Sequence, residues 1–232
     1  MKKVDHAPSK RYQEAKSKVD LTRSYPLREA VDLIKETATV KFDSGVDVHL
    51  RLNINPKKGD QQVRSTVSLP HGTGKVTRVA VITGNGDQQK AATAAGADLV
   101  GEQDLINQIK DGKIDFDVLV ATPESMRLLA PIAKVLGPKG MMPNPKDGTV
   151  AANVGDAVKN LKKGKVSFKN DDSGNLHVLI GRASFTTDAL AENFQSLIDS
   201  VQKAKPATVK GSYIKNVTIA SSMGPGIVIS LT

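Results

Sequence analysis

The chain has 232 residues, no cysteine and a formal net charge of +9, and no apolar run approaches the length of a membrane span. The lack of cysteine excludes disulfides, thiolate catalysis and zinc-ribbon sites, and it fits a cytoplasmic protein. The first residues have no apolar core behind their charges and are not a secretory signal. The excess of positive charge makes a polyanion the leading candidate partner.

The positive charge lies in the two ends of the chain. Residues 1–69 hold 14 Lys and Arg against 9 Asp and Glu, and residues 162–232 hold 9 against 5. Residues 70–161 hold 10 of each sign and are neutral. We therefore expect the two ends to form one basic unit that surrounds a neutral insert.

The N-terminal end predicts two helices and two strands. Residues 9–20 are polar and basic, and residues 25–38 are amphipathic, with Pro26 suited to the first turn. Residues 46–54 alternate between apolar and polar, which is typical of a half-buried strand. Residues 61–69 alternate in the same way, so a hairpin with a loop at 55–60 is predicted.

The pattern changes after the linker at 69–75. A continuous apolar run at 77–84 predicts a strand buried on both faces. Two further strands and several helices follow in alternation, including a helix opened by Pro123 over 123–137. Strand–helix alternation predicts a parallel, doubly wound α/β layer. The Gly- and Pro-rich segment VLGPKGMMPNPKDGTV at 135–150 predicts an ordered irregular loop, and a helix is expected at 154–164.

The alternation of apolar and polar residues resumes in the C-terminal end of the chain. Residues 166–170 and 176–181 predict a second hairpin around the turn 171–175, and residues 186–205 predict a Thr-capped amphipathic helix. Strands are expected at 212–221 and 226–231. The fold class is thus a discontinuous α+β domain with an antiparallel or mixed sheet, interrupted by an α/β insert. The predicted domains are 1–69 with 162–232, and 70–161.

No catalytic constellation stands out. GTGK at 72–75 fails as a phosphate-binding loop, because Leu69 and Val76 occupy its Gly and hydroxyl positions. TGNGDQQK at 83–90 has Gln89 where a dinucleotide loop has its third glycine. The four histidines (His6, His49, His71 and His177) have no metal-type spacing, and His49 and His177 are expected on solvent-facing sides of strands.

Two segments of the basic ends suggest an RNA-binding surface. TVKFDSG at 39–45 and SSMGPG at 221–226 offer hydroxyls, exposed backbone and apolar side chains, which can reach 2′-hydroxyls and unstacked bases. Lys165, Lys169 and Asn170 would add phosphate contacts. The shortage of aromatic residues argues for recognition of a folded RNA shape and against a base-stacking platform.

Long motifs that span nearly the whole chain resemble one family. KFDSGVDVHLRL, DQQVRSTVSLPHGTGK, VLGPKGMMPNPKDGTV, FKNDDSGNLHVLIGRASF and SSMGPG, in this order, resemble the bacterial large-subunit ribosomal protein L-one family. The resemblance implies a domain made from both termini and an inserted Rossmann-like, three-layer domain. It also implies a protein that binds large-subunit rRNA to form the mobile stalk, helps deacylated tRNA leave the E site, and represses its own operon by binding the mRNA leader.

The resemblance also implies a set of RNA-binding residues. By position these are Lys41, Phe42, Lys169, Asn170, Asp171, Ser222, Met223 and Gly224. Gly45 stands where the family usually has Thr, and Asp172 stands where a basic residue is usual, so a hydroxyl and a phosphate contact are in doubt there.

The expected protein is therefore not an enzyme, needs no cofactor or metal, and is a cytoplasmic ribosomal protein that is monomeric outside the ribosome and does not bind membranes. Two alternatives stay open. One is a nucleotide-dependent enzyme that uses the α/β insert, and the other is a basic regulator that binds only mRNA.

Overall fold

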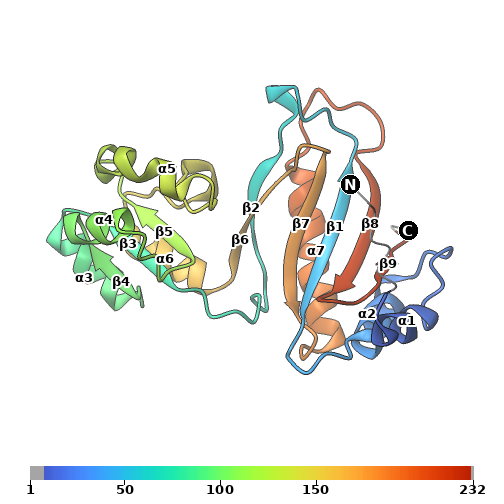
Figure 1. Ribbon diagram of the computed structural model, residues 1–232. Helices are drawn as coiled ribbons and strands as arrows, with labels where there is room; N and C mark the ends of the chain where they lie inside the picture. The colour runs from blue at the N-terminus through green and yellow to red at the C-terminus, as the bar shows by residue number, and fades with distance from the viewer. Residues whose placement is uncertain (1–7, 231–232) are drawn as a thin grey trace, which may run out of the picture. The chain divides into compact units, whose positions relative to one another are not determined.

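The computed structural model describes residues 8–230, and the chain divides into two compact units (Figure 1). Unit 1 contains Met1–Val63, Leu69–Gly74 and Phe168–Thr232, and unit 2 contains Arg64–Ser68 and Lys75–Ser167. Helices and sheets are mixed, as the predicted α+β character requires. The predicted domain limits near residues 70 and 161 stay a prediction.

Unit 1 is built on a four-stranded antiparallel sheet in the order β7-β1-β8-β9. Its strands are β1 (Gly45–Leu52), β7 (Asn175–Arg182), β8 (Ile214–Ser221) and β9 (Gly226–Val228). Alternation sets the two faces of β1: Val46, Val48, Leu50 and Leu52 are buried, whereas His49 and Arg51 on the opposite face reach solvent.

Helices α2 (Leu27–Thr37) and α7 (Thr187–Lys203) cover the buried face of this sheet, and they pack against each other and against its strands. Helix α1 (Lys10–Ser17) packs against α2. The predicted cap of α7 is present, since Thr186 Oγ1 accepts a hydrogen bond from Ala189 N at 3.2 Å. Every apolar residue expected on its inner face is buried: Leu190, Phe194, Leu197, Ile198 and Val201.

Both predicted hairpins are wrong. β2 (Arg64–Ser68) pairs with β6 (Lys165–Lys169) in a separate two-stranded sheet, so it is not the partner of β1, and β6 is not the partner of β7. The reason is that β1 is central: β7 and β8 hydrogen-bond to both of its edges, which leaves none for β2. Apolar alternation specifies which face of a strand is buried, but it does not specify the neighbouring strand.

Unit 2 contains a three-stranded parallel sheet in the order β4-β3-β5, with helices on both faces. The strands are β3 (Val79–Ile82), β4 (Leu99–Gly101) and β5 (Val118–Ala121). Val79 and Val81 join the core under α3 (Gly86–Ala94) and α6 (Val154–Lys162). Ala80 and Ile82 join the opposite core under α4 (Gln103–Lys110).

The helix predicted over 123–137 is mostly a 3-10 helix. It consists of η2 (Ser125–Ile132) followed by one short α-helical turn, α5 (Ala133–Leu136). Pro131 lies inside η2, where it has no N–H to donate and its ring crowds the preceding turn, so a regular α-helix is not favoured. The apolar spacing of the segment alone does not reveal this.

The loop at 135–150 is ordered by contacts within unit 2. Met141 and Met142 pack against the core beside α4, and Asn144 N donates to Thr149 Oγ1 at 2.8 Å. The Asp147 carboxylate is buried and forms a forked ion pair with Arg64. Met141, Met142 and Asp147 of this loop therefore contribute to the packing of unit 2. Within residues 8–230, no helix is both long and apolar enough to cross a bilayer.

Candidate RNA-binding surface

Two turns of unit 1 meet at one end of its sheet. Residues 41–44 lead into β1, and residues 222–225 follow β8. Val46 and Ser221 are register partners, and Ser222 N donates to Gly45 O at 2.9 Å. The structure thus brings the KFDSG and SMGPG motifs together although they lie about 180 residues apart in the chain.

Apolar side chains project from both turns into solvent. Phe42 is 56% exposed and Met223 is 69% exposed. Among residues 8–230, Met223 is the only residue other than glycine with a positive φ, at 65°. A left-handed conformation is costly for a side chain with a Cβ, and such strain is concentrated at functional sites. Met223 gains little burial from this position, so packing within the fold does not explain its conformation.

Charged side chains hold the two turns in place. Arg11 of α1 donates to Met223 O at 2.9 Å and to Thr39 Oγ1 at 3.4 Å. The Asp43 carboxylate accepts hydrogen bonds from Ser184 N at 3.1 Å and Ser184 Oγ at 2.8 Å. Because four segments are tied together, the backbone of this surface is ordered before any ligand binds.

Side chains lie close to two glycines of these turns. A Cβ at Gly224 would lie 2.2 Å from Ser221 Oγ, and a Cβ at Gly45 would lie 2.8 Å from Leu179 Cδ1. A larger residue at either position therefore requires the neighbouring side chain to move.

Buried hydroxyls without partners lie in the same turns. Three buried side-chain oxygens in residues 8–230 have no hydrogen-bond partner, and two of them are Ser44 Oγ and Ser221 Oγ. Unsatisfied polar groups destabilise a fold by roughly 1–3 kcal/mol each and are rare in native proteins. Ser44 lies in the turn before β1, and Ser221 is the last residue of β8, next to the turn that follows.

Asn170 and Asp171 are committed to the fold. Asn170 is buried, and its Oδ1 accepts from Val63 N at 2.7 Å. The Asp171 carboxylate accepts from Asn175 N at 2.7 Å and Ser173 N at 2.9 Å, and these bonds, led by the backbone N–H of Asn175, lower its pKa to about 2. Both side chains close the turn before β7, so an RNA contact by either remains a prediction.

The predicted site residues therefore fall into separate groups. Lys41, Phe42, Ser222, Met223 and Gly224 share one end of the sheet. Lys169, Asn170 and Asp171 lie near Asn175, which pairs with Arg51 at the other end of β1, about 20 Å away at the rise per residue of a strand. Lys165 belongs to unit 2, where a Cβ on Gly148 would lie 2.5 Å from its Nζ.

Sequence reasoning missed the residues that support the surface, namely Arg11, Asp43, Arg182 and Ser184. Arg182 donates from Nη1 to Asp43 O at 3.1 Å. Only Asp43 carried a local signal, because Asp commonly accepts backbone hydrogen bonds in turns. The role of Arg11 depends on a contact 212 residues away in sequence.

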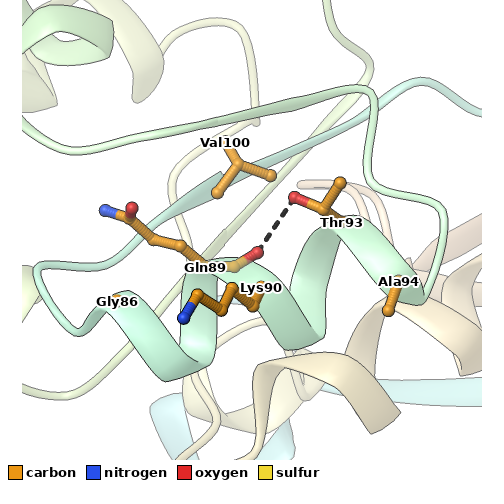
Figure 2. Close-up of a pocket in the computed structure, with 6 residues that line it drawn as sticks. All are labelled: Gly86, Gln89, Lys90, Thr93, Ala94 and Val100. Atoms are coloured by element: carbon orange, nitrogen blue, oxygen red, sulfur yellow. Dashed lines mark hydrogen bonds between the residues drawn. The ribbon is translucent and has the colours of Figure 1, made fainter.

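The loop after β3 in unit 2 does not have the form of a dinucleotide site. An open hollow of about 650 Å³ lies along α3. Figure 2 shows the residues that line it, which are Gly86, Gln89, Lys90, Thr93, Ala94 and Val100. Gln89 Nε2 donates to Thr83 O at 2.8 Å, so this side chain folds back onto the loop where a dinucleotide fingerprint has glycine. Within residues 8–230 no group of three or more His, Cys, Asp or Glu is arranged to hold a metal ion. His6 lies outside the described residues.

A chain with a net charge of +9 and an ordered surface of exposed apolar side chains fits the class of nucleic-acid-binding proteins, and comparison with known proteins gives the family. The sequence pattern of the Ribosomal protein L1p/L10e family matches residues 34–225. The chain belongs to this family, so it is a ribosomal protein and not an enzyme, and its place is the ribosome in the cytoplasm.

Two relatives are similar over almost their whole length. The large ribosomal subunit protein uL1 of Mycoplasma capricolum subsp. capricolum is 54% identical over 220 residues, which cover 94% of this chain and 96% of the relative. The protein of the same name from Mycoplasma mycoides subsp. mycoides SC is 53% identical with the same coverage.

Proposed function

We propose that this protein is a structural constituent of the large ribosomal subunit that binds large-subunit rRNA through the turn surface, defined as residues 41–45 and 222–225. The observation that carries the proposal is Met223, an exposed apolar side chain on a strained backbone that Arg11 holds in place. Phe42 offers a second apolar contact for unstacked bases, and Ser222 offers a hydroxyl for 2′-OH groups.

The basic residues of unit 1 supply the electrostatic part of binding. Lys41 is exposed beside Phe42, and Lys169 is exposed at the far end of the sheet. Lys165 lies in unit 2, and its proposed phosphate contact is separate from the turn surface. The surface is ordered and has few aromatic rings, so it recognises a folded RNA and not a flexible single strand.

The same surface is proposed to serve the finer functions of the family. The bound rRNA would form the mobile stalk from which deacylated tRNA leaves the E site. An mRNA leader that imitates the rRNA fold would occupy the same turns, and the protein would then repress its own operon. In this proposal the protein is a monomer outside the ribosome, residues 1–69 and 162–232 form the binding domain, and residues 70–161 form an inserted Rossmann-like domain.

The salt dependence of rRNA binding tests the proposal. Each phosphate contact by Lys or Arg adds roughly 0.7–0.9 to the slope of log K against log salt, so Lys41→Ala and Lys169→Ala should each reduce the slope by about one. Lys90→Ala, in unit 2, is the matched control and should leave the slope unchanged. An equal reduction by Lys90→Ala would contradict the assignment of the site to unit 1.

Competition between two RNAs tests the shared surface. If one site serves both, an rRNA stalk fragment and the mRNA leader should displace each other fully, with each inhibition constant equal to the dissociation constant measured directly. Simultaneous binding of both RNAs would refute a common site.

A further inference from the structure

The face of the unit 1 sheet that faces away from the helices carries a pair of histidines in direct contact. His49 on β1 and His177 on β7 are register partners of the antiparallel ladder. Their Nδ1 atoms are 2.8 Å apart, and the rings meet edge to face with centroids 5.0 Å apart. Directly opposed side chains on neighbouring strands have their Cβ atoms close together, which is the spacing that lets two imidazoles share one ligand.

A carboxylate lies near one ring of the pair. The Asp171 Oδ2 atom lies 3.6 Å from His177 Nε2, which is a charge contact and not a hydrogen bond. The contact favours the tautomer of His177 that carries its hydrogen on Nε2 and has a lone pair on Nδ1. A carboxylate behind the distal nitrogen of an imidazole is the arrangement that metal-binding histidines use to fix tautomer and ring orientation.

We propose that His49 and His177 form a two-histidine chelate for a divalent transition-metal ion, with Asp171 as the residue that positions His177. The rings must turn from their hydrogen bond before both lone pairs face one ion. With metal–nitrogen bonds of about 2.05 Å and the 2.8 Å separation kept, the ligand–metal–ligand angle would then be about 86°. This is close to the right angle between neighbouring ligands in square-planar or octahedral complexes, as of Cu²⁺ and Ni²⁺.

Tetrahedral zinc fits the pair less well. Its ligand angle of about 109° requires the nitrogens to be about 3.3 Å apart, so the two strands or rings must separate by about 0.5 Å. The general order of affinities of divalent metal ions agrees with this geometric preference, because Cu²⁺ binds more tightly than Ni²⁺ or Zn²⁺ to a given set of ligands. Cu²⁺ should therefore bind most tightly.

The surroundings leave room for the ion and do not repel it. A hollow of about 220 Å³ lies over the pair, and Asn175, Asn216, Thr218 and Arg51 line it. Asp171 lies 3.6 Å from His177 and Arg51 lines the hollow, so the carboxylate offsets the positive charge of the guanidinium.

Binding changes a tautomer without releasing a proton. In the free protein one Nδ1 carries a hydrogen that it donates to the other Nδ1 across the 2.8 Å contact. When both Nδ1 atoms bind the ion, this hydrogen moves through solvent to the Nε2 of the same ring, and both rings stay neutral. The protein supplies two ligands, and water fills the remaining positions.

Titration of the full-length protein with CuCl₂, NiCl₂ and ZnCl₂ tests the proposal, with calorimetry against a competing chelator of known affinity. We expect one site with Cu²⁺ tightest, and an affinity for Cu²⁺ reduced at least tenfold in both His49→Gln and His177→Gln. Asp171→Asn should weaken binding by roughly 10-fold, as for removal of a residue behind a ligand. His71→Gln, the matched control, should bind as the parent does, because His71 pairs with Glu192 elsewhere in unit 1.

A second measurement uses the unmodified protein, so it does not depend on the folding of variants. Substoichiometric Cu²⁺ should broaden the imidazole resonances of His49 and His177 together, before those of His71. Broadening of His71 first, a tighter site for Zn²⁺ than for Cu²⁺, or parental affinity in His49→Gln would overturn the proposal.

Discussion

Met223 offers a test that separates the strain of its backbone from the contact that its side chain makes. Its φ of 65° is unfavourable for any residue with a Cβ by roughly 1–2 kcal/mol, whereas glycine adopts it freely. Glycine also gives the unfolded chain more freedom, which costs about 0.4–1 kcal/mol. The difference predicts that Met223→Gly is about 1 kcal/mol more stable than Met223→Ala, the reverse of the usual order of alanine and glycine.

The two variants are compared by urea denaturation and thermal melting. Since the side chain is 69% exposed, its removal costs little burial in either variant. A difference of about 1 kcal/mol should appear as a melting temperature roughly 2–4 °C higher for Met223→Gly. Both variants should bind rRNA more weakly than the parent, because both lack the apolar contact. An alanine variant as stable as the glycine variant would refute the strain on which the argument rests.

Three further predictions concern the scaffold of unit 1. Asn193→Leu should destabilise unit 1 by about 3 kcal/mol in urea denaturation. The reason is that the buried Asn193 amide donates to Ile180 O and Gly72 O and accepts from His71 N. The control, Gln195→Leu at an exposed position of the same helix, should change stability by less than about 0.5 kcal/mol. Tyr213→Phe should leave the melting temperature unchanged or raise it, because the buried Tyr213 hydroxyl has no hydrogen-bond partner. Burial also raises the pKa of this hydroxyl to about 12. A clear loss of stability in the variant would mean that the hydroxyl does have a partner. The fold lowers the pKa of Asp171 to about 2, whereas its pKa in the unfolded chain is near 4. The carboxylate therefore contributes to the free energy of unfolding above pH 4, and this contribution is lost as the pH falls from about 4 to 2. Asp171→Asn should therefore lower the free energy of unfolding by about 1 kcal/mol at pH 7, a value reduced because the side chain is more than one third exposed. The variant should also lose less stability than the parent as the pH falls from 4 to 2. An equal loss in both proteins would show that the fold does not stabilise the carboxylate.

The sequence predicted features that depend on local pattern. Alternation identified the buried face of β1, and the spacing of apolar residues identified the inner face of α7. The two turn motifs were recognised as one surface because both precede or follow strands of the basic ends. Pairing of strands was not predictable, since β1 takes both its neighbours from the C-terminal end and a strand pattern does not name its partner.

Side-chain roles inside turns were equally hidden. Asn170 and Asp171 were predicted to face RNA, yet the fold uses the buried Asn170 amide on Val63 and the Asp171 carboxylate on its own turn. The contact of His49 with His177 spans 128 residues, so no spacing in the sequence indicates it. Such contacts are created by tertiary register, which appears only when the sheet is assembled.

The most direct test of the account is the affinity of the full-length protein for a stalk-forming fragment of large-subunit rRNA, measured for Met223→Asp and for Leu128→Asp. Both positions hold exposed apolar residues, at 69% and 40% exposure, but Met223 lies on the turn surface of unit 1 and Leu128 lies in unit 2. The account predicts at least a tenfold loss for Met223→Asp, about 1.4 kcal/mol, and a change below about twofold for Leu128→Asp. Parental affinity in Met223→Asp, with folding intact, would contradict the assignment of RNA binding to this surface.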